Sequence, residues 1–157
     1  MKELFDVHCH MVPGVDDGAA DLEESLAMLK MQHEDGVRKI IITPHYRRRM
    51  FETPAKKVHE QFLKLQEAAK KEYPDMSLYL GCELHSNMDL QDILEKRKYV
   101  TMAGSSYVLL EFSEGDSAQH IRERVYNVLS CGYEPIIAHV ERYQATVTVS
   151  YTHLTLP

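Results

Sequence analysis

The sequence of 157 residues has no tryptophan and few cysteines, and its start does not resemble an export signal. Cys9, Cys82 and Cys131 are odd in number and far apart, and no C-x-x-C pair occurs. This distribution argues against a disulfide framework and a structural zinc knuckle, and it favours a reducing compartment. The first ten residues carry charges and histidines where a secretory signal needs an uninterrupted apolar core. We therefore expect a cytoplasmic protein.

Long apolar runs and an excess of positive charge are also missing. No run approaches the ~18 residues that a membrane helix needs, so we expect no membrane insertion. The 18 lysines and arginines are outnumbered by 24 aspartates and glutamates, which gives a net charge of −6. That balance argues against nucleic acid or an anionic membrane as the main partner. The 44% hydrophobic and 27% charged residues are typical of a globular protein, and the length fits one domain.

Three signatures of enzymes that act on phosphates or esters are absent. There is no G-x-x-x-x-G-K-[ST] phosphate loop and no G-x-S-x-G nucleophile elbow. A cysteine phosphatase needs an arginine six positions after its cysteine, and those positions hold Val15, Met88 and Ile137. If the protein is an enzyme, a bound metal therefore has to activate the nucleophile.

Two hydrophobic periods alternate along the chain, and they predict strands separated by helices. Short apolar runs predict buried strands at residues 4–8, 39–43, 78–83, 107–112 and 135–139. Helical spacing predicts helices at residues 21–36, 53–73, 89–96 and 117–132. Asp21 and Ser117 are the expected N-caps, and Pro54 the expected first residue of its helix. This alternation indicates a parallel sheet, either doubly wound or closed as a (β/α) barrel, and the G-x-G-x-x-G turn that favours the first is absent.

Histidine and glutamate occur at the end of every predicted strand. The candidate metal ligands placed there are His8, His10, His45, Glu83, Glu111 and His139. In a parallel barrel all strand carboxyl ends open on one face, so these side chains are expected to converge, and this favours the barrel. Residues i and i+2 of a strand point the same way, so His8 and His10 can reach one ion. Imidazole with carboxylate suits zinc, manganese or iron, and two glutamates suggest more than one ion.

The remaining histidines carry weaker signals. His33, His59 and His120 fall within predicted helices and are expected to be ordinary surface residues. His85 follows Glu83 by two residues and could face the same site, but it is not assigned as a ligand. Asp16 is expected to orient a ligand from the loop after the first strand.

Five stretches of the chain together resemble a known superfamily. They are residues 8–18, 43–45, 81–83, 110–112 and 138–143, which read HCHMVPGVDDG, TPH, GCE, LEF and AHVERY. This combination resembles the PHP (polymerase and histidinol phosphatase) superfamily, and most closely the bacterial manganese-dependent protein-tyrosine phosphatases of capsule and exopolysaccharide operons. The likeness covers nearly all of residues 1–143. Val140 departs from the His-Pro-Glu-Arg that this family often has.

The resemblance implies a fold and a set of ligands. It implies an α/β protein with a distorted (β/α)7 barrel of PHP type, present here as about the first five βα units. Two or three Mn²⁺ ions are implied, with Fe or Zn as alternatives. Carried over by motif, His8 and His10 bind one ion, Glu83 bridges to a second that also takes Glu111 and His139, and Asp17 and His45 belong to a third. The family's late Asp-x-His does not follow His139 here.

The chain is expected to divide into two parts. Residues 1–147 are expected to be a C-terminally truncated PHP metallophosphatase domain. Residues 148–157 are expected to be a non-native tail, because from Val149 onward they look like a translated sequencing adaptor. On that interpretation His153 is not a biological residue.

The implied function is hydrolysis of phosphotyrosine on proteins, with control of capsule or exopolysaccharide synthesis. The implied partner is an autophosphorylating bacterial tyrosine kinase. Arg142 is expected to be catalytic by binding a phosphate oxygen, and Arg47 to help bind the substrate. Two alternatives stay open: a PHP phosphatase for a small molecule such as histidinol phosphate, and an inert fragment or non-catalytic metal-binding module.

Overall fold

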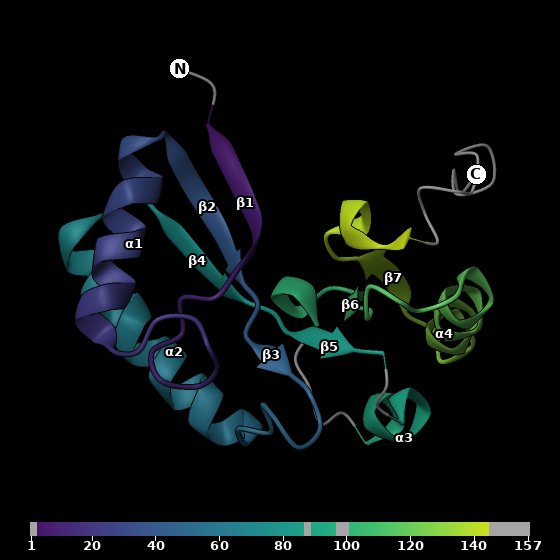
Figure 1. Cartoon of the computed structure of the whole chain (residues 1–157). Helices are drawn as coiled ribbons and strands as arrows, with labels where there is room; N and C mark the ends of the chain where they lie inside the picture. Colours follow the sequence, from purple (N-terminus) through teal and green to yellow (C-terminus); the bar gives the residue numbers. More distant parts are fainter. Residues whose placement is uncertain (1–2, 87–88, 97–100, 145–157) are drawn as a thin grey trace.

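The computed structural model describes residues 3–86, 89–96 and 101–144, in which helices separate single strands or pairs of consecutive strands (Figure 1). The strands are β1 (Leu4–Cys9), β2 (Val37–Ile42), β3 (His45–Tyr46), β4 (Ser77–Leu80), β5 (Glu83–His85), β6 (Tyr107–Glu111) and β7 (Glu134–Ile137). The helices are α1 (Leu22–Glu34), α2 (Ala55–Glu72), α3 (Leu90–Glu95) and α4 (Ala118–Ser130), with short 3-10 turns η1 (Met102–Gly104) and η2 (Val140–Arg142). The predicted tail at residues 148–157 lies outside the described part.

All pairs among the strands named above are parallel, but these strands form two sheets instead of one. The first has the order β1-β2-β4, and the second has the order β3-β5-β6-β7. The chain crosses from the first sheet to the second twice, between β2 and β3 and between β4 and β5 (Figure 1). The α/β class and the parallel strands are therefore confirmed.

The prediction of one strand at residues 78–83 is wrong in one respect. The chain forms two strands there, β4 in the first sheet and β5 in the second. Gly81 and Cys82 form the junction, and both are buried. A Cβ at Gly81 would lie 3.0 Å from the Met102 sulfur and 3.1 Å from methyl groups of Ile41 and Thr43, so the bend is tightly packed. Apolar residues occupy both sides of the bend, and an apolar run cannot reveal a change of sheet.

Hydrogen bonds continue across this bend and hold the two sheets together. Thr43 N donates to Cys9 O at 2.8 Å, and Gly81 N donates to Ile42 O at 2.8 Å. Glu83 N donates to Pro44 O at 3.0 Å. The backbone ladder thus passes from one sheet into the next without leaving these groups unpaired.

The helix starts follow local sequence signals. The Asp21 carboxylate accepts a hydrogen bond from Glu24 N at 2.9 Å, and Glu24 accepts one from Ala20 N at 2.7 Å, which confirms the first cap. Ser117 Oγ accepts from His120 N at 3.1 Å and caps α4 as expected. Pro54 is the N-cap of α2 and not its first residue, because its ψ of 135° is outside the helical range.

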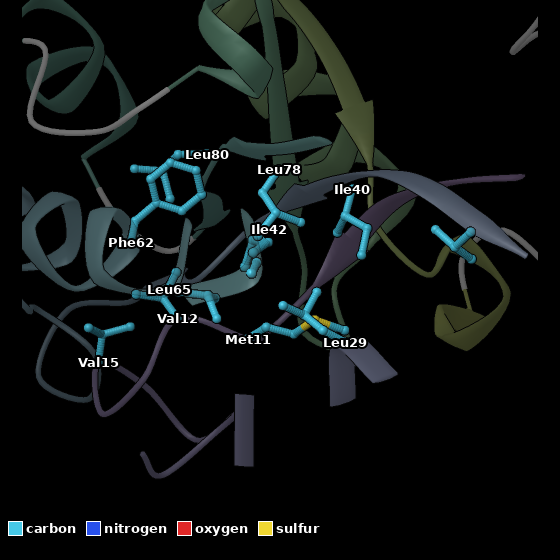
Figure 2. Packing of buried hydrophobic residues seen from close by; sticks show 12 residues of the cluster. Met11, Val12, Val15, Leu29, Ile40, Ile42, Phe62, Leu65, Leu78 and Leu80 are labelled. Atoms are coloured by element: carbon cyan, nitrogen blue, oxygen red, sulfur yellow. The ribbon is translucent and has the colours of Figure 1, made fainter. Parts of the chain in front are cut away.

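Helices cover one face of each sheet. α1 and α2 lie on one side of the first sheet, and the core between them contains Leu29, Ile40, Ile42, Phe62 and Leu65 (Figure 2). A second core joins α3 and α4 to β5 and β6. The opposite face of the first sheet exposes Phe5, Val7 and Tyr79. The helices in the described part of the chain are too short or too polar to cross a membrane.

Candidate metal centre

The two junctions between the sheets bring the predicted ligands to one place. His8 is in β1 and His10 follows it, Glu111 is the last residue of β6, and His139 lies just after β7. His45 and Glu83 were expected at strand ends, but each is the first residue of a strand in the second sheet. They still lie beyond the carboxyl ends of β2 and β4, because the chain bends there. The predicted convergence follows from this bend as well as from the parallel strands.

Glu83 lies at the centre of the cluster and is fully buried. Four imidazole nitrogens surround it: its Oε2 is 3.0 Å from His8 Nε2, 3.2 Å from His10 Nε2 and 3.2 Å from His45 Nδ1, and its Oε1 is 3.1 Å from His139 Nε2. Burial alone would raise the pKa of this carboxyl, but the contacts with His10 and His8 hold it well below its usual range. Glu83 is therefore an ionised carboxylate inside a ring of imidazoles.

Glu111 is the second carboxylate of the cluster. Its Oε2 lies 3.8 Å from His45 Nδ1 and its Oε1 lies 3.7 Å from His139 Nε2. Burial and the negative charge of Glu83 raise its pKa, whereas the charges of His45 and Arg47 oppose that rise. Two carboxylates held this close repel each other unless cations lie between them.

The loop after β1 positions His10 and His45 through Asp16. Asp16 Oδ2 lies 2.8 Å from His10 Nδ1 and also accepts a hydrogen bond from His45 N at 2.9 Å. Its Oδ1 accepts from Gly18 N at 3.1 Å. Burial would lower the pKa of His10, but contacts with Asp16 and Glu83 raise it to about 9. The expected orienting role of Asp16 agrees with this geometry.

Asp17 stands at the rim of the cluster. Its side chain is 62% exposed, and its Oδ1 lies 3.6 Å from His45 Nε2. Asp16 and Asp17 therefore differ sharply: one is inside, bonded to backbone and imidazole, and the other faces solvent beside His45. The seventh predicted ligand is thus also brought to the cluster.

In the described part of the chain, three overlapping groups of side chains have donor atoms within 4.8 Å of one another, a spacing that could hold a metal ion. They are His8, His10 and Glu83; His10, Asp17 and His45; and His45, Glu83 and Glu111. The groups share His10, His45 and Glu83, so neighbouring ions could share ligands. His139 Nε2 lies 3.1 Å from Glu83 Oε1 and 3.7 Å from Glu111 Oε1.

The two predicted arginines differ in their relation to the cluster. Arg47 is half-buried, and its charge acts on Glu111. Arg142 lies in η2, and its side chain is 62% exposed with its Nε 3.9 Å from Glu141 Oε1. The structure therefore puts Arg47 near the cluster and turns Arg142 toward solvent.

Two residues without an assigned role also border the cluster. His85 is buried in β5, and its Nε2 lies 4.0 Å from Glu111 Oε2. Tyr143 is buried, and its hydroxyl lies 3.0 Å from His139 Nδ1. Burial raises the pKa of this phenol to about 12. The spacing of Tyr143, four residues after His139, is the one sequence signal that could have indicated this contact.

The three histidines on the described helices do not join the cluster. His33 Nε2 lies 2.9 Å from Asp75 Oδ1 on the surface, and His120 Nε2 lies 3.9 Å from Asp116. His59 is exposed on α2. These positions agree with the expectation that the helical histidines are surface residues.

The chain has a parallel α/β fold with a buried glutamate among four imidazoles. These features place it in the class of proteins with a candidate multinuclear metal centre. The particular family follows from comparison with known sequences. The chain belongs to the family described as capsular polysaccharide synthesis, CpsB/CapC, whose model matches residues 4–154. The likeness to capsule-operon tyrosine phosphatases seen in the motifs is thereby confirmed.

Individual relatives support the same assignment. The chain is 42% identical over 142 residues to the tyrosine-protein phosphatase CpsB of Streptococcus pneumoniae, a match that covers 90% of this chain and 58% of that protein. It is 30% identical over 139 residues to the tyrosine-protein phosphatase YwqE of Bacillus subtilis, covering 88% and 55%. The chain thus spans a little over half the length of these relatives.

A solved structure shows the same fold. It is described as one of the crystal structures of YwqE from Bacillus subtilis and CpsB from Streptococcus pneumoniae, unique metal-dependent tyrosine phosphatases. The TM-score is 0.80 at 30% identity, and the match covers 89% of this chain and 57% of the other.

Proposed function

We propose that this chain is part of a metal-dependent phosphatase that hydrolyses phosphotyrosine on proteins. The observation that carries the proposal is the position of Glu83, a buried carboxylate with four imidazole nitrogens within 3.2 Å. Membership of the CpsB/CapC family supports the substrate class, because related proteins are named tyrosine-protein phosphatases. The missing Cys and Ser nucleophile motifs fit the same proposal.

The side chains of the cluster fit divalent metal ions. Among the described residues, His45 Nδ1, Glu83 Oε2 and Glu111 Oε2 are buried and make no hydrogen bond of good geometry, although imidazole nitrogens lie 3.0–3.2 Å from Glu83 Oε2. Such atoms are costly unless something else satisfies them, and imidazole with carboxylate is a suitable donor set for a transition metal. The three atoms belong to one of the ligand groups described above.

We propose that the cluster binds two or three Mn²⁺ ions, with Fe or Zn as alternatives. The proposed ligands are His8, His10, Asp17, His45, Glu83, Glu111 and His139. Divalent ions bound there would lower the pKa of water to give a nucleophile near neutral pH and would offset charge on the phosphoryl oxygens. The protein's part is to hold the ligands in place, which Asp16 does for His10 and His45.

Cationic side chains of this chain would hold the phosphate. Arg47 is one candidate, since its charge already acts on Glu111. Arg142 is three residues beyond His139, and we propose that it binds a phosphate oxygen by charge-assisted hydrogen bonds when its side chain turns from Glu141 toward the cluster. Asp17, exposed at the rim, marks the side from which the substrate would enter.

The two sheets fit a part of one PHP-type barrel. Their strands are all parallel, and hydrogen bonds at Thr43, Gly81 and Glu83 join them. The relatives are longer than this chain, which supports the proposal that residues 1–147 are the first part of a longer domain. The non-native origin of residues 148–157 stays a prediction. Sequencing the intact gene locus tests it, and the prediction is contradicted if the gene itself encodes these ten residues after residue 147.

The proposed partner follows from the substrate class. We propose that the substrate is a phosphotyrosine protein, and specifically an autophosphorylating bacterial tyrosine kinase that acts in capsule or exopolysaccharide synthesis. The name of the matching family supports a role in capsular polysaccharide synthesis. A cytoplasmic location stays a prediction from the cysteine pattern.

The test of this function uses the full-length protein with Mn²⁺, para-nitrophenyl phosphate and a phosphotyrosine peptide. We expect activity that a chelator removes and added Mn²⁺ restores, and a loss of at least ~100-fold in His139→Ala. His59→Ala, on the exposed face of α2, is the control and should retain activity. Activity that survives both the chelator and His139→Ala would refute the metal mechanism.

Two further measurements separate the alternatives. Histidinol phosphate assayed beside the phosphotyrosine peptide tests the small-molecule phosphatase, which would prefer the former. Titration of Mn²⁺ into the 157-residue chain beside the full-length protein tests the inert fragment, which would bind Mn²⁺ weakly or not at all while the full-length protein binds it.

A further inference from the structure

Tyr143 has a buried hydroxyl that contacts two segments bordering the cluster, the end of β6 and the residue His139 after β7. Its side chain is 1% exposed. Phe112 N, the backbone group directly after Glu111, donates a hydrogen bond to the Tyr143 hydroxyl at 3.0 Å. The same hydroxyl lies 3.0 Å from His139 Nδ1. One phenol oxygen therefore connects the end of β6 with the segment after β7.

The chemistry of a phenol suits this double contact. A tyrosine hydroxyl has one donor and can accept on its oxygen, so it can accept from Phe112 N–H and still pair with an imidazole nitrogen in either direction. Phe112 also packs edge-on against the Tyr143 ring, with centroids 5.8 Å apart. The hydrogen bond from Phe112 N and the ring packing hold the hydroxyl in a fixed position, so that it can orient the His139 ring.

His139 needs such an orienting contact because its backbone conformation is unusual. Its φ is +28°, in the left-handed region that few residues other than glycine adopt. The imidazole is held at both ends: Nδ1 faces Tyr143, and Nε2 lies 3.1 Å from Glu83 Oε1. A contact at Nδ1 leaves Nε2 as the nitrogen that faces the two carboxylates.

We propose that Tyr143 is a positioning residue for His139, which holds the imidazole so that Nε2 faces the metal site between Glu83 and Glu111. This inference rests on the proposed function, because it takes the cluster to be a metal site. Asp16 makes the corresponding contact with His10 Nδ1 at 2.8 Å. Asp16 adds a negative charge there, whereas Tyr143 orients its histidine without adding one, in a place where two carboxylates already repel each other.

The test compares Tyr143→Phe with Tyr133→Phe in the full-length protein. Both substitutions remove one hydroxyl from a tyrosine that packs in or against the second core, but Tyr133 lies outside the cluster. Metal-free proteins are titrated with Mn²⁺ by calorimetry. We expect Tyr143→Phe to bind Mn²⁺ about 10-fold more weakly than wild type, the usual size of a lost partner of a metal-binding histidine. Tyr133→Phe should bind as wild type does.

A second measurement distinguishes positioning from a general structural role. In the protein loaded with diamagnetic Zn²⁺, nuclear magnetic resonance of the histidine rings should show a protected Nδ1–H proton for His139. We expect this signal in wild type and Tyr133→Phe, and its loss to exchange with water in Tyr143→Phe.

The outcomes separate the inference from the function on which it rests. Equal Mn²⁺ affinity in wild type and Tyr143→Phe, with the His139 signal retained, would overturn the role of Tyr143 alone. Equal weakening in the two tyrosine variants would reduce Tyr143 to a packing residue and also overturn it. A wild-type protein that binds no Mn²⁺ would overturn the proposed function, and the inference with it.

Discussion

His10 and Asp16 are joined by a 2.8 Å contact between the imidazole Nδ1 and the carboxylate Oδ2. The same carboxylate oxygen accepts a hydrogen bond from the backbone of His45 at 2.9 Å. One buried side chain therefore sets the orientation of one candidate ligand and the backbone position of another. A carboxylate behind a histidine is a common arrangement around metal ions, because it orients the ring and raises its basicity.

Asp16→Asn should weaken Mn²⁺ binding about 10-fold, since it removes the charge that favours His10 as a ligand while keeping the shape of the side chain. The measurement is a calorimetric titration of the metal-free full-length protein. Asp75→Asn is a matched control, because Asp75 also pairs with a histidine, His33, at 2.9 Å but on the surface. Equal affinities in the two variants would contradict the orienting role of Asp16.

Gly18→Ala should damage the same loop for a steric reason. A Cβ at Gly18 would overlap the carbonyl oxygen and Cβ of His10, so the loop or the histidine has to move. We expect a loss of Mn²⁺ affinity and a lower melting temperature. Gly115→Ala is the control, because a Cβ at Gly115 meets nothing within 4 Å. Wild-type Mn²⁺ affinity in Gly18→Ala would show that the loop can shift without moving His10.

Glu83→Gln tests the central carboxylate. The amide has nearly the same shape but carries no charge, and its NH₂ group cannot bind a cation. We expect phosphatase activity to fall at least ~100-fold. We also expect Mn²⁺ binding to be lost at the sites that use Glu83 as a ligand. Activity and bound metal are measured on the same samples. Glu67→Gln, which removes an exposed partner of Lys71, should change neither quantity.

The stability of the metal-free protein should depend on pH through the titration of His10. Contacts with Asp16 and Glu83 outweigh burial and raise its pKa from 6.5 to about 9. A group whose pKa is raised on folding stabilises the folded state fully below its unfolded pKa, and this contribution disappears as the pH rises through the folded value. The free energy of unfolding should therefore fall between pH 6.5 and about 9, by roughly 3 kcal/mol at most.

Denaturant unfolding of wild type and His10→Gln at several pH values checks this expectation. The decrease between pH 6.5 and 9 should be smaller in the variant, which has no titrating ring at this position. Mn²⁺ affinity of wild type should rise over the same window, because a ligand imidazole has to lose its proton before it binds a cation. Parallel pH profiles for wild type and variant would contradict the assignment to His10.

Arg47→Gln tests substrate binding beside the cluster. The charge of Arg47 reaches Glu111, so it should also attract a phosphate dianion at the same opening. We expect the KM for a phosphotyrosine peptide to rise about 10-fold, the size of a lost charge-assisted hydrogen bond, with a smaller change in kcat. Arg122→Gln, on the exposed side of α4, is the control. A KM that does not change would remove Arg47 from the substrate site.

Local features of the fold could be predicted from the sequence because they depend on neighbouring residues. The caps at Asp21 and Ser117 are formed by side chains that bond to backbone groups three residues away. Apolar periodicity places the strands and helices, since burial on one face requires it. The change of sheet at Gly81 has no such signal, because buried apolar residues flank it on both sides.

The candidate site shows the same division. By itself the sequence determined which side chains could bind metal, because histidine and glutamate recur at intervals of one βα unit and parallel strands bring such positions together. Only the tertiary structure decided that Glu83 is the centre, that Tyr143 contacts His139 and that Arg142 faces solvent. These relationships depend on how the chain bends between two sheets and on side-chain direction, and neither is encoded in the spacing of residues along the chain.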